Sequence, residues 1–420
     1  MSDAGEVYRG NLPEANLEEG QDNVLSRGIR SSPSHVVAVG EGSRKTRVLF
    51  VLPSLHAGGS ENYVLRLVRF AGHEAFEWHV LSPNLERGDL HEAFVSEGVQ
   101  VRYQSIGYLN PAKALRLYRY LKAGEFDVVC TLTGVFGGLT LAIAKAAGVK
   151  SRVGWHRRST PAFSPTWGRR AYARLALWLL ESSSTRILSN GRAALDHFHG
   201  VNWVSDDRFA VIPNGVDTRA LLVHGDTKEE ERKALGLQVD AFVVGHVGRF
   251  DPAKNHETIF RVAADLVQRE PGARFVFCGK GTDSAAFKQQ LERFGIADQC
   301  VALGLQPNLP RVYRSFDVFY FPSVTEGQPN ALIEAILAKL PLVASDIPGN
   351  RDVVPPFLHA ELVPPMAVKQ AVEAILTKFR EAQGGTQEAL EWASERFDLE
   401  KNMTLALQAL APAPAGADRA

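Results

Sequence analysis

The fold of this chain is most constrained by an alternation of short, β-rich apolar runs with segments of helix length. In the first half, the strand candidates are RVLFVLP, WHVLSP, VQVRYQSI, DVVCTL, SRVGWH, TRILS and FAVIPN. After a charged patch, HGDTKEEERKALGL, the alternation restarts with FVVGHVG, ARFVFCG, CVALG, VFYFPS, PLVASD and AELVP. This pattern is typical of parallel sheets covered by helices on both faces. We therefore predict an α/β chain with two doubly wound parallel-sheet domains of similar size.

The length of 420 residues also favours two domains, because a chain of this size exceeds one ordinary hydrophobic core. The polar first residues and the tail APAPAGADRA show no sustained periodicity and are predicted to be disordered. The predicted boundaries are a disordered segment over 1–44, a first domain over 45–217, a second domain over 218–384, a C-terminal helix over 385–411 that crosses back to the first domain, and a disordered tail over 412–420.

Composition excludes several classes of function. Lys plus Arg equals Asp plus Glu at 47 each, so no overall charge points to nucleic acid. The cysteines Cys130, Cys278 and Cys300 lie far apart, which suggests neither a zinc site nor a disulfide framework. No stretch approaches the ~18 apolar residues of a spanning helix, and the N-terminus lacks the apolar core of a signal peptide. We predict a cytoplasmic protein.

Polar and glycine residues gather directly after the predicted strands. Open parallel sheets bind ligands beyond the carboxyl ends of their strands, and two facing domains would place a cleft there. The segments at these positions are SLHAGGSEN, TGVFGG, HRRSTP, GRFDPAKN, GKGTDS and SVTEGQPN. We expect the functional residues to come from these loops.

A glycine pair, Gly58 and Gly59, lies between the first strand and a helix predicted to begin near Ser60. Free N–H groups at a helix start favour an anion, and missing side chains let a ligand approach the backbone. Such pairs are also common in α/β proteins without a ligand. The loop matches neither the dinucleotide pattern G-x-G-x-x-G nor the P-loop, so both functions lose support.

Three basic or titratable side chains follow other strands. Arg249 and Lys254 lie in one strand-to-helix loop and could grip a diphosphate; the alternative is a solvated surface loop. His156 ends a strand and could hold a sugar hydroxyl or shuttle a proton, although a lone histidine is more often structural. The chain has no Asp-x-Asp pair and no His/Asp cluster with ligand spacing, so we predict no metal site.

The segment TEGQPNALIEA carries two glutamates, Glu326 and Glu334. A helix is predicted from Asn330, with Asn330 as its N-cap after Pro329, and its apolar residues predict burial nearly all round. An ionised carboxylate buried there needs a partner, solvent or a ligand. The alternative is that Glu334, in the first turn, only complements the helix dipole.

From about Arg47 to Leu410 the chain resembles the retaining glycosyltransferases of family 4, also called glycosyl transferases group 1. The motifs GGSEN, VIPNGVD, VGRFDPAKN, FCGKGTD and FPSVTEGQPNALIEA occur in the family's order, and the last carries its two glutamates separated by seven residues. The resemblance implies a GT-B fold of two facing Rossmann-like domains, with the acceptor bound by the first and a nucleotide diphosphate sugar by the second. Where many relatives have histidines after the fourth strand, this chain reads CTLTGVFGG.

The resemblance also implies roles for individual residues. Glu334 would bind the ribose, Glu326 the donor-sugar hydroxyls, and Arg249 and Lys254 the diphosphate. His156 would lie beside the anomeric centre. The remaining implied donor contacts are Gly58 and Gly59 near the phosphates, Gly279 and Gly281 near the nucleobase, and the backbone of Gln328, Pro329, Asn330 and Ala331 near the sugar or distal phosphate.

The implied activity is transfer of a hexose-type sugar, with retention and without a metal or cofactor, to a glycan or lipid-linked acceptor in cell-surface polysaccharide or glycolipid synthesis. One alternative is a non-catalytic subunit that only binds a nucleotide sugar. Another is a phosphorylase or epimerase of the same fold, although no pyridoxal lysine site is recognisable. The segment TWGRRAYARLALWLLESS is basic and amphipathic, so peripheral contact with anionic membrane is expected as an alternative to a packed, solvated helix.

Overall fold

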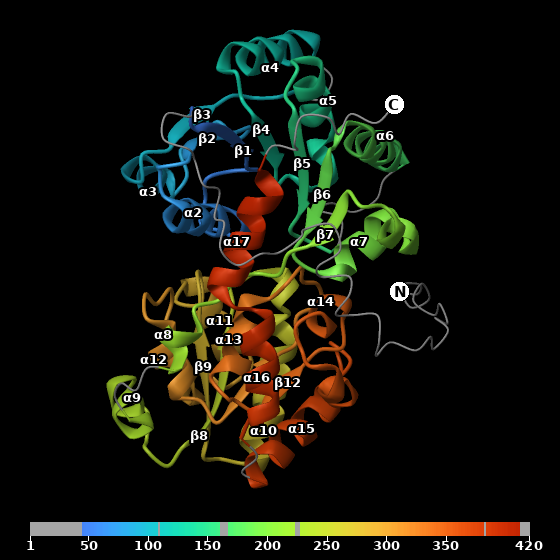
Figure 1. Ribbon diagram of the computed structural model, residues 1–420. Helices are drawn as coiled ribbons and strands as arrows, with labels where there is room; N and C mark the ends of the chain where they lie inside the picture. Colours follow the sequence, from blue (N-terminus) through green and yellow to red (C-terminus); the bar gives the residue numbers. More distant parts are fainter. Residues whose placement is uncertain (1–43, 108–109, 160–166, 223–226, 382–383, 412–420) are drawn as a thin grey trace.

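The computed structural model describes residues 44–107, 110–159, 167–222, 227–381 and 384–411. Of the ends predicted to be disordered, all but Arg44 lie outside the described residues. Figure 1 shows two α/β domains, one above the other, each built around its own sheet. Among the described residues, no helix combines the length and the apolar character that crossing a membrane requires.

The first domain contains a seven-stranded sheet in the order β3-β2-β1-β4-β5-β6-β7. All neighbouring strands run parallel. The strands are β1 (Thr46–Val51), β2 (Phe76–Ser82), β3 (Gln100–Tyr103), β4 (Val128–Thr131), β5 (Ser151–His156), β6 (Arg186–Ser189) and β7 (Phe209–Val211). Central strands such as β4 are buried along their whole length, which explains why their sequences are continuously apolar rather than alternating.

Helices cover both faces of this sheet. They are α2 (Gly59–Ala71), α3 (His91–Ser96), α4 (Pro111–Gly124), α5 (Gly138–Ala146), α6 (Trp167–Ser183) and α7 (Arg192–His199), with short 3-10 turns η1 (Gly134–Gly137) and η2 (Val201–Ser205). Local sequence explains their starts. Proline at the first position of α4 needs no N–H partner, and the Asn110 side chain accepts hydrogen bonds from the N–H groups of Ala112 and Lys113.

The second domain contains a five-stranded parallel sheet in the order β10-β9-β8-β11-β12. Its strands are β8 (Phe242–Val247), β9 (Ala273–Cys278), β10 (Cys300–Ala302), β11 (Val318–Phe321) and β12 (Leu342–Ala344). The prediction of a further strand at AELVP is wrong. The first two of those residues, Ala360 and Glu361, end a 3-10 turn, η5 (Pro356–Glu361), and only Val363 forms a single bridge, to Ser345.

The helices of the second domain are α8 (Thr218–Leu222), α9 (Lys228–Ala234), α10 (His256–Arg269), α11 (Ala285–Arg293), α12 (Leu309–Arg314), α13 (Asn330–Leu337), α14 (Pro348–Arg351), α15 (Val368–Arg380) and α16 (Gln387–Arg396), with 3-10 turns η3 (Pro252–Lys254) and η4 (Ala297–Gln299). A last helix, α17 (Leu399–Leu410), runs from the second domain to the first (Figure 1). Its residues Met403, Ala406 and Leu410 are buried in the core of the first domain, against β1 and α2.

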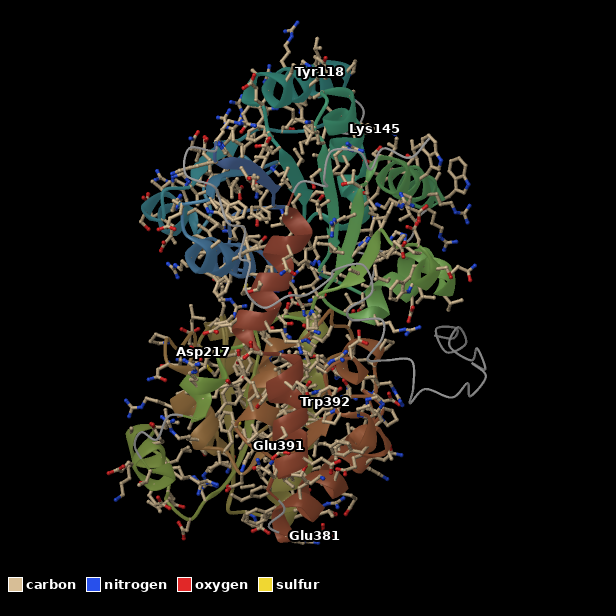
Figure 2. The ribbon with its side chains drawn as sticks, in the orientation of Figure 1. Tyr118, Lys145, Asp217, Glu381, Glu391 and Trp392 are labelled. Carbon is tan, nitrogen blue, oxygen red and sulfur yellow. The ribbon has the colours of Figure 1, made fainter. Side chains whose placement is uncertain are left out.

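The strand order reverses once in each sheet, between β1 and β4 and between β8 and β11. Ligands of doubly wound sheets bind beyond the carboxyl ends of the strands at such points. The loops concerned follow β1, β4, β8 and β11, and all four were predicted to carry function. In Figure 2, Asp217 lies where the two domains meet, whereas Tyr118 and Glu381 mark opposite ends of the molecule.

Candidate active site

The loop after β11 is held against the first domain by hydrogen bonds. The N–H of Asn214 donates to Gln328 Oε1 at 2.5 Å, and its Nδ2 donates to Asn330 Oδ1 at 2.7 Å. The Ser159 hydroxyl donates to the carbonyl of Glu326. A Cβ on Gly327 would lie 2.4 Å from the carbonyl oxygen of Arg157, so this approach requires glycine. The predicted donor loop therefore lies directly at the domain junction.

Helix α13 begins one residue earlier than predicted. Pro329 is its N-cap and Asn330 its first helical residue, so the predicted capping role of Asn330 is wrong. The Asn330 side chain instead accepts from Asn214, because a partner from the other domain lies within reach. The N–H groups of Asn330 and Ala331 belong to a first turn, where no intrahelical carbonyl can satisfy them. They remain suited to an anion or a sugar hydroxyl.

Glu334 already has partners within the protein. The Tyr313 hydroxyl donates to its Oε2 at 2.8 Å, and the guanidinium of Arg66, on α2 of the first domain, exerts a favourable charge on it. Burial raises the pKa of Glu334 to about 7, while Tyr313 and Arg66 act in the opposite direction. Of the predicted options, the structure thus gives Glu334 a partner within the protein, and its role at a ribose stays a prediction. The dipole alternative is wrong, because Glu334 lies beyond the first turn of α13.

Lys254 and Glu326 form an ion pair between the loops that follow β8 and β11 in the second domain. Lys254 Nζ lies 2.6 Å from Glu326 Oε1, and the two side chains are 17% and 13% exposed. The loop that presents Lys254 is fixed locally: the Asp251 side chain caps η3 by accepting from the Ala253 N–H at 2.9 Å. Asn255 then adopts a left-handed conformation. The two predicted residues are therefore brought together at one side of the β8/β11 switch point.

Arg249, the other predicted cation, is exposed and faces the start of α2 in the first domain. Its charge favours the ionised form of Glu61, although burial of that carboxyl raises its pKa. The Glu61 carboxylate folds back over the helix start, and a Cβ on Gly58 would lie 2.5 Å from its Oε2. Gly59 has no atom within 4 Å of its Cβ position, so space remains beside it.

His156 ends β5 and is only 1% exposed. Its ring stacks on Phe198, and its Nε2 lies 3.0 Å from Nε2 of His199. Burial, reinforced by His199, lowers the pKa of His156 to about 3. A histidine with this pKa stays neutral near pH 7, which favours the predicted hydroxyl-holding role over the proton shuttle.

Gly279 and Gly281 follow β9 and adopt positive φ angles of 145° and 87°. A Cβ on Gly279 would lie 2.2 Å from the carbonyl oxygen of Gly248, which follows β8. Close packing of two neighbouring loops therefore explains this glycine without a ligand. The role of both glycines at a nucleobase stays a prediction.

Several buried polar atoms around the donor loop have no hydrogen-bond partner among the described residues. They are Arg157 Nη1, His156 Nδ1, Asn190 Oδ1 and Gln328 Nε2. Buried polar groups in native proteins are almost always paired, so such a concentration requires an explanation. Arg157 is otherwise well held, over the Tyr63 ring at 3.9 Å and with Nη2 donating to Asn214 Oδ1 at 2.8 Å. A polar ligand between the domains would supply the missing partners.

The sequence reasoning missed four residues that shape this site: Arg66, His199, Asn214 and Tyr313. Asn214 lies in VIPNGVD, a motif that was identified without a role for its residues. His199 was not singled out, because nothing in its neighbourhood along the chain connects it with His156. Arg66 and Tyr313 occupy helices, where the sequence gives no signal that they meet Glu334. The described residues bring together no group of three or more His, Cys, Asp and Glu able to hold a metal ion.

Two family models match the chain. Glycosyltransferase Family 4 matches residues 57–220, and Glycosyl transferases group 1 matches residues 227–391. The putative glycosyltransferase EpsF of Bacillus subtilis is 28% identical over 307 residues, which are 72% of this chain and 80% of EpsF. The UDP-Gal:alpha-D-GlcNAc-diphosphoundecaprenol alpha-1,3-galactosyltransferase of Escherichia coli is 30% identical over 261 residues, 60% of this chain and 66% of that enzyme.

Solved structures agree on the fold. HepE of Anabaena, in a crystal structure with UDP and glucose, superposes with a TM-score of 0.70 at 20% identity, covering 87% of this chain and 99% of HepE. The lipopolysaccharide outer core galactosyltransferase WaaB superposes with a TM-score of 0.63 at 18% identity, covering 86% and 99%. The two family matches lie one on each domain and together span most of the chain. The chain therefore belongs to the glycosyl transferases group 1, glycosyltransferases with the two-domain GT-B fold.

Proposed function

We propose that this glycosyltransferase transfers a hexose-type sugar, with retention, from a nucleotide diphosphate sugar to a glycan or lipid-linked acceptor in cell-surface polysaccharide or glycolipid synthesis. The names of relatives support this assignment. The Escherichia coli relative uses a UDP-sugar and a diphosphoundecaprenol acceptor, and a relative at 25% identity acts in Staphylococcus aureus capsule biosynthesis. HepE, of the same fold, was crystallised with UDP-glucose.

The observation that carries the proposal is the meeting of Lys254 with Glu326 at the β8/β11 switch point. Arg249 comes from the same loop as Lys254, and α13 begins in the same loop as Glu326. Breaking the bond between the anomeric carbon and the phosphate oxygen leaves positive charge on the sugar and a second negative charge on the diphosphate. Two cations and free helix N–H groups can stabilise that charge without a metal ion. We accordingly propose a metal-independent and cofactor-independent reaction, in which Glu326 also accepts hydrogen bonds from donor-sugar hydroxyls.

The proposed stereochemical course is attack of the acceptor on the same face from which the nucleotide leaves. Glu326 is held at 2.6 Å from Lys254, and this pairing reduces its strength as a nucleophile. The leaving phosphate would then take the acceptor proton as the new glycosidic bond forms. Intact-mass analysis after incubation with donor alone tests this course, because a covalently glycosylated protein would contradict it.

The donor can be identified with UDP-, GDP- and ADP-sugars, by calorimetric binding and by slow release of nucleotide in the absence of acceptor. Wild type is compared with Glu334→Ala and with Glu391→Ala, a matched change on α16 of the second domain (Figure 2), at an exposed position. We expect one nucleotide class to bind wild type and Glu391→Ala, and Glu334→Ala to lose both binding and release. Binding without release, even with acceptors present, would favour the non-catalytic alternative.

The membrane contact also belongs to the proposal. Helix α6 exposes Trp167 and Trp178, at 87% and 61%, and its arginines Arg170 and Arg174 are exposed on the same element. Aromatic and basic side chains together suit the surface of an anionic membrane, where a lipid-linked acceptor would be found. We expect flotation with anionic vesicles that falls in Trp178→Ser. Absence of flotation by the wild type would contradict this part of the proposal.

A further inference from the structure

The His156 side chain is the first member of a buried hydrogen-bonded chain that leads away from the candidate site. His156 Nε2 lies 3.0 Å from His199 Nε2, and His199 Nδ1 lies 2.6 Å from Glu181 Oε1. The three residues come from β5, the end of α7 and α6. The His199 side chain is 2% exposed and that of Glu181 is 39% exposed, so the chain runs from the interior to the surface.

The order of atoms in this chain decides which nitrogens carry protons. A carboxylate only accepts, so the hydrogen bond to Glu181 requires a proton on His199 Nδ1. Burial lowers the pKa of both histidines, so both rings are neutral near pH 7. The second nitrogen of His199 is then bare, and the short contact between the two Nε2 atoms requires the proton on His156. Consequently Nδ1 of His156 is a bare acceptor.

That acceptor lies at the edge of the first sheet where the donor loop docks. His156 Nδ1 is buried and has no partner among the described residues, and the same is true of Asn190 Oδ1. The two residues are close, since the N–H of Asn190 donates to the carbonyl of His156. The next residue, Gly191, lies against the Gly327 carbonyl of the donor loop, 3.5 Å from its Cβ position. Two bare acceptors call for hydrogen-bond donors, which hydroxyl groups provide and phosphate oxygens do not.

We propose that Glu181 and His199 are positioning residues that hold His156 as its Nε2–H tautomer, so that His156 Nδ1 accepts a hydrogen bond from a sugar hydroxyl. This inference rests on the proposed function and adds two residues, Glu181 and His199, that lie behind His156. Arg208 faces the same group of residues: it donates to the Glu181 carbonyl at 2.7 Å and is itself paired with Asp206. Its charge opposes protonation of His199 and so favours the same tautomer.

Histidine-selective ¹⁵N NMR of the full chain tests the tautomer directly, with His156→Gln used to assign the signals. We expect wild-type His156 to show a protonated Nε2 and a bare Nδ1. His199→Leu removes the hydrogen bonds that link His156 to Glu181. His199→Gln keeps one acceptor and one donor at a similar separation. The expected result is loss of the fixed tautomer in His199→Leu and its recovery in His199→Gln. His197→Leu, on the same helix but exposed, should leave the His156 signals unchanged.

Turnover provides the second readout. Loss of one neutral hydrogen bond predicts a fall of about three- to tenfold in kcat for His199→Leu, with recovery in His199→Gln. Affinity for the nucleoside diphosphate alone should stay at the wild-type value, because it has no sugar to contact His156. Glu181→Leu changes a partly exposed position, so it serves as a second variant if His199→Leu folds poorly. It should show the same fall in kcat, but a smaller one.

Either of two results would overturn the inference: a proton on Nδ1 of wild-type His156, or wild-type kcat in His199→Leu. The NMR measurement needs no substrate. A wild type that is inactive with every nucleotide sugar would therefore refute the proposed function. The tautomer of His156 would still show whether Glu181 and His199 hold its ring as inferred.

Discussion

The pH dependence of nucleotide binding should be set by Glu334, and Tyr313→Phe should shift it. Burial raises the pKa of Glu334 to about 7. In the ribose-binding role that the family resemblance implies for Glu334, the ribose hydroxyls donate to the carboxylate and favour its ionised form, so we expect affinity to rise as pH increases through about 7 and then level off. The same coupling predicts that binding near pH 7 releases part of a proton into the buffer.

Tyr313→Phe removes the hydroxyl that donates to Glu334 at 2.8 Å and leaves the buried ring in place. A hydrogen bond to a charged group contributes about 1.5 kcal/mol or more, which corresponds to roughly one pKa unit. The midpoint should then move up to about 8. At pH 7 the ionised fraction falls from roughly one half to roughly one tenth, so affinity should drop about fivefold. Near pH 9 the two proteins should bind about equally.

Calorimetry measures both the midpoint and the proton release. The nucleotide identified in the donor screen is titrated from about pH 6 to pH 9, in two buffers of different ionisation enthalpy. Tyr320→Phe makes the same change at another buried tyrosine, which packs in a separate core cluster on β11, and should leave the midpoint in place. An identical midpoint in wild type and Tyr313→Phe would refute the assignment of the transition to Glu334. A loss of affinity that persists unchanged at pH 9 would also refute it.

Three further changes test other parts of the site. The added Cβ of Gly59→Ala meets no atom within 4 Å, so the melting temperature should stay unchanged or rise slightly. If a phosphate approaches there, nucleotide affinity should fall about tenfold in calorimetry. Unchanged affinity would exclude that contact. Gly327→Ala forces its Cβ against the Arg157 carbonyl and should destabilise the protein by about 1–3 kcal/mol in thermal unfolding while weakening donor binding. Burial raises the pKa of Asp352 to about 6, above its unfolded value, so its ionisation destabilises the fold increasingly as pH rises from about 4 to about 6 and remains unfavourable above that. Asp352→Asn should therefore raise the free energy of unfolding by roughly 1–3 kcal/mol at about pH 8, seen as a higher melting temperature, and have little effect at about pH 4. A larger gain in stability at pH 4 than at pH 8 would contradict this direction.

The fold could be predicted because its signal is local. Strands buried on both faces must be apolar throughout, and each expected run from RVLFVLP to PLVASD overlaps one of the strands in the two sheets. AELVP is an exception because only Val363 of that run is buried, and a short run with apolar residues does not show that a neighbouring strand is free to pair with it. At Val363 only one bridge to Ser345 forms.

Candidate residues of the site could be named from the sequence, but the contacts between them could not. Lys254 and Glu326 were both identified from their loops, and the structure joins them because those loops follow adjacent strands, β8 and β11. The partners of Glu334 could not be found in this way, since Tyr313 and Arg66 come from helices in different domains. His199 likewise reaches His156 only through packing of α7 beside β5.

Asn214 shows why such contacts matter for a site formed by two domains. Its side-chain oxygen accepts from Arg157 at 2.8 Å, its Nδ2 donates to Asn330, and its carbonyl accepts from Asn402, which lies on α17. One residue thus joins the first domain, the donor loop and the helix that returns from the second domain. Each of these bonds ends on a different segment, so a displacement of any segment breaks at least one of them. The position of the donor loop is therefore fixed by the contact between domains as much as by its own sheet, and a change far from the ligand, at Asn402, should alter donor affinity.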